Sequence, residues 1–318
     1  QIDGIEESDL IILIGTNPRY EATILNSRIR KAYLNNNVDI YSFGDVGNLT
    51  YPYKILDNST KTINEIINNK HIISELIKKS QKPIFIIGQS LLKLNSAVYV
   101  FEELKKYLTI NNKINNQWNS LNILSNNAST VGSYDLEILS SKNGKNITLE
   151  KIKKNEFDII FLFGQENLKF KKKNEFIIYI GSHGDRGAEM SDIILPSATY
   201  TEQDGYFTNL EGKIQKAYKA SFPPGEAKED WQIINDLAAS LKRKNLYINK
   251  EELINSMLNF LNLHKDKTFE VPEYEFINES IHVDDLDYYH SNSIARASKT
   301  MNECKKLSSS NKKKVVEG

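Results

Sequence analysis

Five short apolar runs, each ending at a glycine, form the main pattern of this chain. They are residues 10–14 before Gly15, 38–43 before Gly44, 84–87 before Gly88, 159–163 before Gly164 and 177–180 before Gly181. Apolar character that is continuous rather than alternating is typical of parallel strands with both faces buried under helices. A glycine at the carboxyl end lets the chain turn sharply toward the next helix. The pattern predicts an α/β fold with a doubly wound, mainly parallel sheet.

Amphipathic helices are predicted where apolar residues recur at helical spacing. Two lie within the repeated pattern, at residues 20–34 and 91–108. Their buried faces are expected to consist of Ile24, Leu25, Ile29 and Ala32 in the first helix and Leu94, Val98, Phe101, Leu104 and Leu108 in the second. A third helix opens at Glu229-Asp230-Trp231 and runs through Leu241, because acidic residues suit the positive end of the helix dipole.

The chain is expected to form one large α/β domain, residues 1–244, followed by a helical or irregular C-terminal extension, residues 245–318. A polar, Asn- and Ser-rich segment at about 118–154, with one or two short helices, is expected to be a surface excursion between the third and fourth strands. The extension is expected to contain a helix near residues 250–263, an extended arm at residues 272–286, and a helix at residues 291–306 with Ser291 or Ser293 as its N-cap.

The composition of the chain excludes several kinds of partner and of metal or redox site. The 318 residues include 41 basic and 41 acidic side chains, so no net charge draws the chain to nucleic acid or anionic lipid. The single cysteine excludes an internal disulfide and a protein-held iron-sulfur cluster. The five histidines lack zinc-site spacing. No apolar run approaches the roughly 20 residues that cross a bilayer, so membrane association is expected only through partners. The chain begins at Gln1 without an initiator methionine, which suggests a piece of something longer.

Two glycine-containing loops are candidate sites. Gly15-Thr16-Asn17-Pro18-Arg19 follows the first strand, where α/β sheets receive anionic ligands, but it lacks the G-x-G-x-x-G spacing and is equally typical of a simple strand-to-helix turn. The loop at residues 181–187 places His183 near Asp185, a pair suited to acid-base catalysis. No nucleophile or second acid accompanies the pair, and its glycines serve tight turns equally well.

Other reactive side chains have structural interpretations. Glu202, Asp204 and Glu211 resemble a carboxylate group, but they lie next to Gly205 and Gly212, which favours turn chemistry. Cys304 shares a predicted helical face with Met301 and Leu307, where a lone cysteine is usually a small buried hydrophobe. No residue is therefore assigned a catalytic, cofactor-binding or metal-binding role.

One segment, residues 181–215, carries a family resemblance. An apolar strand at residues 191–196 stops at a proline, and the pairs Asp204-Gly205 and Glu211-Gly212 then bracket an aromatic strand in a predicted hairpin. This order resembles the signature of the molybdopterin oxidoreductase superfamily, and within it the family of the largest iron-sulfur subunit of respiratory complex I. Further marks of that likeness are residues 2–9, 15–22, 26–31, 49–51 and 223–231, and above all the tail at residues 293–301.

The resemblance implies that the chain is the C-terminal portion of that subunit, in which the fold is kept and the cofactor has generally been lost. It implies a structural platform in the peripheral arm, on the matrix side of the mitochondrial inner membrane. This platform supports electron transfer from NADH to ubiquinone without a redox centre of its own. The implied partners are the N-terminal iron-sulfur portion and other peripheral-arm subunits, including the flavoprotein and quinone-module subunits.

Two enzyme hypotheses stay open beside this one. A fragment of an active molybdopterin-dependent oxidoreductase would carry molybdenum and an organic pterin. A free nucleotide-binding dehydrogenase would bind NAD, although the dinucleotide fingerprint is missing.

Overall fold

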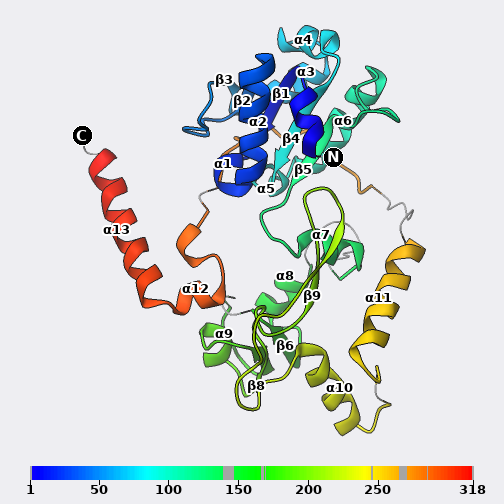
Figure 1. Cartoon of the computed structure of the whole chain (residues 1–318), viewed down its shortest axis with the longest axis vertical. Coiled ribbons are helices and arrows are strands. Elements are labelled where there is room, and N and C mark those ends of the chain that lie inside the picture. The colour runs from blue at the N-terminus through cyan, green and yellow to red at the C-terminus, as the bar shows by residue number, and fades with distance from the viewer. Residues whose placement is uncertain are drawn as a thin grey trace. The chain divides into compact units, whose positions relative to one another are not determined.

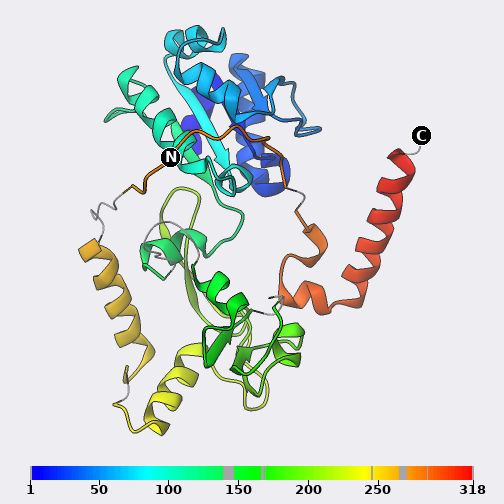
Figure 2. The same cartoon turned by 180° about the vertical axis from the view of Figure 1, so that it is seen from behind.

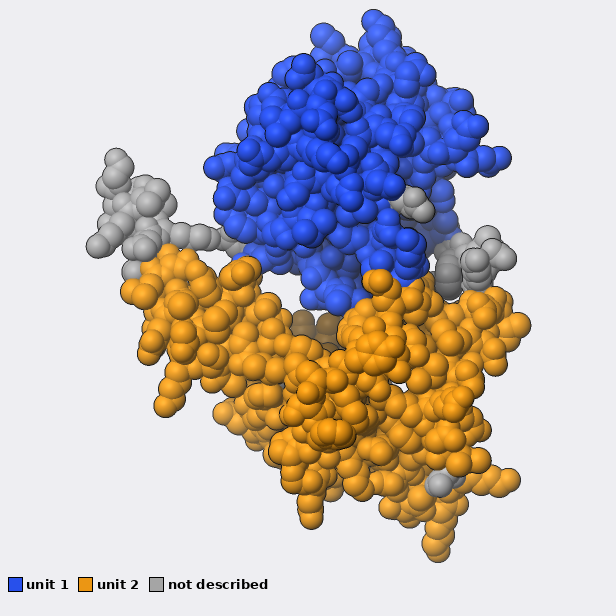
Figure 3. Space-filling model, viewed as in Figure 1, with its two compact units in different colours: residues 1–131, 208–213, 269–286 blue, residues 132–207, 214–268, 287–318 orange. Residues whose placement is uncertain are grey.

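A computed structural model of the chain describes residues 2–138, 147–165, 168, 170–244, 246–264, 271–284 and 286–316. The chain divides into two compact units, coloured separately in Figure 3. Unit 1 consists of residues 1–131, 208–213 and 269–286, and unit 2 of residues 132–207, 214–268 and 287–318. The expected boundary between residues 244 and 245 stays a prediction.

Unit 1 is built on a five-stranded parallel sheet of order β3-β2-β1-β4-β5 (Figure 1). Its strands are β1 (Leu10–Ile14), β2 (Asp39–Phe43), β3 (Lys54–Asp57), β4 (Pro83–Gly88) and β5 (Leu121–Leu124). Its helices are the 3-10 helix η1 (Ile2–Glu7), α1 (Pro18–Glu21), α2 (Thr23–Asn36), α3 (Thr60–Ile67), α4 (Ile73–Lys79), α5 (Gln89–Leu92) and α6 (Ala97–Ile110). The strand order reverses between β1 and β4, as in other doubly wound sheets.

Both faces of this sheet are buried. Leu10, Ile12 and Ile14 pack with residues of α3, α4 and α6 in one apolar cluster. Ile11 and Leu13 pack with residues of α2 in a second cluster on the opposite face. Every residue of β1 and of β4 is buried, as their continuous apolar pattern predicted.

Unit 2 contains a smaller parallel sheet of order β6-β7-β8. Its strands are β6 (Ile159–Phe163), β7 (Phe176–Gly181) and β8 (Ile193–Pro196). Its helices are α8 (Ile147–Lys154), α9 (Arg186–Glu189), α10 (Asp230–Ser240), α11 (Lys250–His264), the 3-10 helix η2 (Tyr288–His290), α12 (Ser293–Ala297) and α13 (Lys299–Val316). The predicted hairpin forms from β9 (Gly205–Thr208) and β10 (Ile214–Ala217). The short helix α7 (Thr130–Asp135) lies at the boundary between the units.

The expectation that both faces of every repeated strand are buried is wrong for β6. Ile160 and Leu162 pack against Ile152 of α8, whereas Ile159, Phe161 and Phe163 on the other face are exposed. The pattern of five consecutive apolar residues is the same as in β1, but only one face of β6 is covered by the described residues.

The expected surface excursion at residues 118–154 is partly wrong as well. It contains β5, which pairs with β4 in the main sheet and buries Leu121 and Leu124. α7 and α8 follow, while residues 139–146 lie outside the described part of the chain. Short strands such as β3 and β5 lack the glycine-ended apolar pattern, so the sequence did not indicate them.

Three predicted helices are interrupted. The helix expected at residues 20–34 breaks at Ala22, between α1 and α2, and Ile24 is exposed rather than buried. The helix expected at residues 91–108 breaks between α5 and α6. The helix expected at residues 291–306 breaks at Ser298, and its N-cap is Asn292, whose Oδ1 accepts the Ala295 N–H at 2.9 Å.

The remaining predictions of local structure hold. α10 begins at Asp230 with a capping box between Glu229 and Gln232, and α11 spans the expected residues. Residues 271–284 form the expected extended arm, whose passage across unit 1 is seen in orange in Figure 2. Among the described residues, no helix is long and apolar enough to span a membrane.

Candidate functional site

The carboxyl edge of the five-stranded sheet is the position where doubly wound proteins bind their ligands. The strand order reverses here, between the ends of β1 and β4, and the two backbones meet closely. A Cβ atom added to Gly88 would lie 2.1 Å from the Gly15 carbonyl oxygen, so only glycine fits. Gly15 itself has φ +61°, a left-handed conformation that glycine adopts without strain.

The predicted loop Gly15–Arg19 lies at this edge, and its donors are used by the chain itself. The Thr16 hydroxyl donates to Glu21 Oε2 at 2.8 Å, and the Asn17 N–H donates to Glu21 Oε1 at 2.7 Å. The Asn17 side-chain oxygen caps α1 by accepting the Arg19 N–H at 3.0 Å. A carboxylate of the same chain therefore occupies the place that an anionic ligand would take in this loop.

Burial raises the pKa of Glu21, and the negative charge of Asp284 adds to that rise. The hydrogen bonds from Asn17 and Thr16 act in the opposite direction but do not outweigh burial. A second anion beside Glu21 would raise this pKa further, which is unfavourable at neutral pH.

The arm at residues 277–284 fills the crevice at the sheet edge. Ile281 is only 1% exposed and belongs to the same apolar cluster as Leu10, Ile12 and Ile14. A Cβ atom added to Gly15 would lie 3.4 Å from Ile281 Cγ2, and one added to Gly44 would lie 3.4 Å from the Ile281 carbonyl oxygen. The arm thus contacts the loops after both β1 and β2.

Hydrogen bonds attach the arm to the start of α3. The Thr60 N–H donates to the Glu279 carbonyl at 3.0 Å, and the Glu279 N–H donates to the Thr60 hydroxyl at 2.9 Å. The Ile281 N–H donates to the Asn58 carbonyl at 2.6 Å. These bonds hold the arm in the register that inserts Ile281 between the strand ends.

The arm also binds the segment between α5 and α6. The Glu279 carboxylate accepts the Ser96 N–H at 2.8 Å and the Asn95 side-chain amide at 3.0 Å. Burial acts to raise the pKa of Glu279, but these hydrogen bonds outweigh it and hold the pKa below its ordinary value. The Asp284 N–H donates to the Ser90 hydroxyl at 2.9 Å, and the Asp284 carboxylate forms an ion pair with Lys93. The carboxylate of Glu279 therefore acts as a remote N-cap, which explains the break between α5 and α6.

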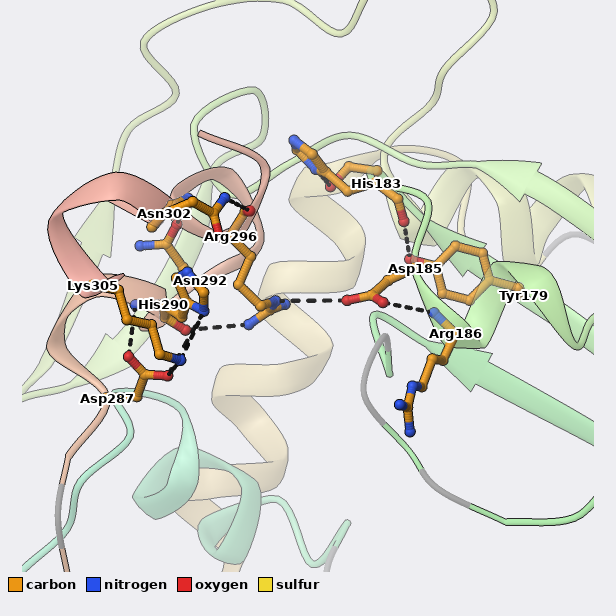
Figure 4. A network of polar contacts seen from close by, with 12 residues as sticks. Tyr179, His183, Asp185, Arg186, Asp287, His290, Asn292, Arg296, Asn302 and Lys305 are labelled. Atoms are coloured by element: carbon orange, nitrogen blue, oxygen red, sulfur yellow. Dashed lines mark hydrogen bonds and ion pairs between the residues drawn. The ribbon is translucent and has the colours of Figure 1, made fainter. Parts of the chain in front are cut away.

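The predicted pair of His183 and Asp185 does not form. His183 Nδ1 lies 2.9 Å from the Ser182 hydroxyl, and its carbonyl accepts the Tyr179 hydroxyl at 2.7 Å (Figure 4). Asp185 instead caps α9 through the Arg186 N–H. The arrangement has the geometry of a turn and not of an acid-base pair.

The glycines of this loop serve the packing of Tyr179. A Cβ atom added to Gly181 would lie 2.2 Å from the Tyr179 hydroxyl oxygen, and one added to Gly187 would lie 3.2 Å from its ring. Burial raises the pKa of Tyr179, which keeps this hydroxyl protonated and donating. Close packing against Tyr179 therefore accounts for Gly181 and Gly187, whereas a Cβ atom added to Gly184 would meet no atom within 4 Å.

The C-terminal tail contacts the same loop (Figure 4). Arg296 Nε lies 3.9 Å from Asp185 Oδ2, and Lys305 binds Asp287 while its Nζ lies 3.1 Å from His290 Nδ1. The ion pair with Lys305 lowers the pKa of Asp287. Asp185 and Arg296 thus join two segments on which the family resemblance rests.

The three carboxylates near the hairpin each accept a backbone N–H, as predicted, but only Glu202 accepts it from a residue of its own turn. Glu202 accepts the N–H of Thr199 at 3.0 Å, Asp204 that of Lys219 at 2.8 Å, and Glu211 that of Ile2 at 3.0 Å. Within the described residues, no group of three or more His, Cys, Asp or Glu side chains is arranged to hold a metal ion.

Cys304 is half-buried on α13, and Leu307 beside it is exposed, so the apolar face predicted there is not a buried one.

The residues that occupy the crevice were not predicted as functional. The sequence placed Ile281 and Glu279 only in an extended arm. The hydrogen-bond partners of Glu279 lie 183 or more residues away along the chain, so no local pattern shows them. Nothing in the sequence separates Ile281 from the other apolar residues of the arm, such as Ile277 and Val283. For Glu21, an acidic residue in the first turn after the N-cap Asn17 was visible in the sequence.

The chain is similar in sequence to subunits of NADH-ubiquinone and NADH-quinone oxidoreductases. The chain is 37% identical over 316 residues to the NADH-ubiquinone oxidoreductase 75 kDa subunit of Reclinomonas americana, covering 95% of this chain and 45% of that protein. It is 36% identical over 312 residues to a subunit of the NADH-quinone oxidoreductase of Rickettsia bellii, covering 95% and 44%. It is 36% identical over 246 residues to the mitochondrial NADH-ubiquinone oxidoreductase 78 kDa subunit of Candida albicans, covering 76% and 33%.

The chain spans less than half the length of these curated relatives. Their names confirm the resemblance to the large subunit of complex I that the hairpin and tail motifs indicated. Residues 1–240, which include both parallel sheets, match the family described as molybdopterin oxidoreductase. The chain therefore belongs to the molybdopterin oxidoreductase family.

Proposed function

We propose that the chain is a structural platform of complex I, the C-terminal part of its large iron-sulfur subunit. It supports electron transfer from NADH to ubiquinone without holding a redox centre. Its place is the peripheral arm on the matrix side of the mitochondrial inner membrane, and its iron-sulfur clusters belong to the part of the subunit that the chain does not span.

One observation carries this proposal: the arm at residues 277–284 occupies the crevice where a doubly wound sheet binds its ligand. Ile281 is inserted between the loops that follow β1 and β2, and it is as buried as the strand residues beneath it. A ligand at this edge would have to displace an apolar side chain from the core, together with the hydrogen bonds of Glu279 and Asp284.

The residues at this edge also do not fit a pterin dinucleotide. A dinucleotide is anionic through its pyrophosphate and needs free N–H donors or cations at a strand end. Here the donors of Thr16 and Asn17 are bonded to Glu21, and Asp284 contributes a second carboxylate nearby. An anionic ligand at this loop would therefore have to displace the Glu21 carboxylate from these donors.

Electron transfer in the whole assembly is proposed from the relatives. Two of them are named as subunits of an NADH-ubiquinone oxidoreductase, one of these mitochondrial, and the third as a subunit of an NADH-quinone oxidoreductase. The single cysteine of this chain supports a role in holding other parts in place, since a four-cysteine cluster site cannot be built from it.

The proposal is tested on the protein isolated in mild detergent from membranes of the cells that make it. Mass spectrometry should find the chain together with flavoprotein and quinone-module subunits. Metal analysis should find iron in the assembly but no molybdenum or tungsten in proportion to the chain. Stoichiometric molybdenum with an extractable pterin would instead establish the alternative, a fragment of an active molybdopterin-dependent oxidoreductase.

A further inference from the structure

The small sheet of unit 2 has one apolar face that the described residues cover only in part. In the parallel register of β6, β7 and β8, residues 159, 161 and 163 share this face with 176, 178 and 180 and with 193 and 195. All eight side chains are apolar. Ile180 on this face is 1% exposed, but five of the eight, here called the open face, are 43–56% exposed: Ile159, Phe161, Phe163, Phe176 and Ile193.

The opposite face shows what a covered surface in this unit looks like. There Ile160, Leu162, Ile177 and Tyr179 are at most 7% exposed, because α8 and residues after β6 pack against them. Only at the edge strand β8 is a described residue of this face, Ile194, exposed, at 54%. Parallel sheets are normally covered on both faces, as the five-stranded sheet of unit 1 is. Clustered aromatic side chains such as Phe161 and Phe163, whose rings stack at 6.3 Å, are typical of interaction surfaces.

The outer edge of β6 is equally unprotected. Within the described residues β6 pairs only with β7, so its other edge offers free N–H and C=O groups. Proteins that keep such an edge in water usually place lysine, proline or a bulge on it. β6 reads Ile-Ile-Phe-Leu-Phe and has none of these features, and its pairing with β7 is regular. Its composition is that of an interior strand.

The occupant can be chosen from the direction of the strands. A second copy that paired across the β6 edge by two-fold symmetry would add an antiparallel strand to an all-parallel sheet. A parallel strand arrives through a crossover that also brings a helix onto the face of the sheet. More than half of the length of each curated relative lies outside the part matched by this chain, which is ample for such units.

We infer that the open face and the free edge of β6 are the docking surface for the portion of the large subunit that this chain does not span. That portion adds a parallel strand beside β6 and lays an apolar helical face over Phe161 and Phe163. The identity of the docked polypeptide rests on the proposed function. The inference adds which surface of unit 2 that polypeptide contacts.

The test uses the assembly isolated from cells that make the chain, with p-benzoylphenylalanine in place of Phe161. The matched control carries the same replacement at Phe222, which is 76% exposed and lies outside the sheet. After irradiation, mass spectrometry should place the crosslink from position 161 in the unspanned portion of the subunit. Its yield onto that portion should exceed that from position 222 by about tenfold, as for a buried aromatic contact.

A crosslink from position 161 to a second copy, to unit 1 of the same chain or to lipid would overturn the inference. So would no crosslink in an assembly that contains the unspanned portion. These results are distinct from failure of the proposed function, which would appear as absence of the respiratory subunits from the preparation. A crosslink to the unspanned portion without those subunits would keep the docking surface and reject the function.

A second measurement uses the double variant Phe161→Ser and Phe163→Ser, with Phe222→Ser as its control. Both phenylalanines lie outside the apolar cluster on the covered face, so the melting of the chain should shift little. The amount of the unspanned portion isolated with the chain should fall by about tenfold, the usual result of removing aromatic anchors. Equal recovery with the double variant and the control would reject the docking surface.

Discussion

The two parallel sheets of this protein are built from the same kind of strand but have different surroundings. β1 and β6 are each five consecutive apolar residues, and each is followed by a glycine. β1 is central in its sheet and buried on both faces, whereas β6 is at an edge and buried on one. The same apolar pattern therefore occurs in a fully buried strand and in one whose second face the described residues of unit 2 leave partly exposed.

The carboxyl edges of the sheets differ in a related way. In unit 1 the edge is closed by the chain's own arm, with Ile281 in the core and Glu279 capping α6. Unit 1 therefore buries its central strands β1 and β4 on both faces, and among its strands exposed apolar residues such as Ile55 and Ile123 occur only in the edge strands β3 and β5. A closed crevice in unit 1 and a partly open sheet in unit 2 are the two features on which the proposed platform role depends.

The largest effect is expected from an aspartate in β1. Ile12→Asp places a carboxylate where the wild-type side chain is 0% exposed, and the loss of stability should exceed about 4 kcal/mol, enough to unfold unit 1. Ile159→Asp, the same change at a 56% exposed position of β6, should cost about 1 kcal/mol or less. Chemical denaturation followed by circular dichroism measures both. Similar losses of stability for the two variants would contradict the difference in burial between β1 and β6.

A smaller effect is expected from truncation of the arm's apolar anchor. Ile281→Ala removes buried methyl groups and leaves a cavity between the strand ends, which should cost about 2–4 kcal/mol. Ile194→Ala, at an exposed position of β8, should cost about 0.5 kcal/mol. Thermal melting gives the difference. An unchanged melting temperature for Ile281→Ala would mean that the arm does not contribute to the core of unit 1.

Next in size is the close contact of β4 with the loop after β1. Gly88→Ala forces a methyl group to within 2.1 Å of the Gly15 carbonyl oxygen, so the strand ends must separate, at about 1–3 kcal/mol. Gly184→Ala in unit 2 meets no atom within 4 Å and should change stability by less than about 0.5 kcal/mol. Denaturant unfolding curves of the two variants measure these changes in stability. An unchanged stability for Gly88→Ala would show that the strand ends can separate to admit a methyl group without cost.

The smallest effect concerns the remote cap of α6. Because the folded pKa of Glu279 lies below its ordinary value of 4.5, its ionised form stabilises the fold. This contribution is complete above pH 4.5 and is lost as the pH falls through the lowered folded pKa. Glu279→Gln should therefore cost about 0.5–1 kcal/mol at pH 7 and nothing in acid, the usual range for a cap.

Glu273→Gln, at an exposed position of the same arm, is the matched control and should be neutral at both pH values. Stability curves at several pH values measure the two variants. A cost for Glu279→Gln that does not change with pH would contradict the role of its charge.

Local sequence signals accounted for much of the fold. All five glycine-ended runs are strands, and the hairpin, α10, α11 and the arm lie where the pattern placed them. These elements follow from contacts between near neighbours, such as the capping box of Glu229 and Gln232. The missed strands β3 and β5 are short and carry polar residues, so their position in the sheet depends on pairing with β2 and β4.

In the candidate sites, too, the sequence predicted the local backbone but not the contacts between distant segments. The sequence identified Gly15–Arg19 and residues 181–187 as the turns at the carboxyl ends of strands, because glycine and proline determine local backbone geometry. It did not show that Glu21 uses the donors of the first turn, or that Asp185 binds Arg296 rather than His183. Side-chain partners in these turns depend on which segments fold beside them.

The sequence by itself determined the five glycine-ended strands, the hairpin and the resemblance to the family, since these depend on local periodicity and on motifs of fixed spacing. Tertiary structure alone decided that Ile281 closes the crevice of unit 1 and that Phe161 and Phe163 are left exposed in unit 2. The physical reason is that an apolar side chain specifies burial but not the segment that buries it. For Leu10–Ile14 that segment lies within the chain, and for one face of Ile159–Phe163 no described residue of the chain provides it.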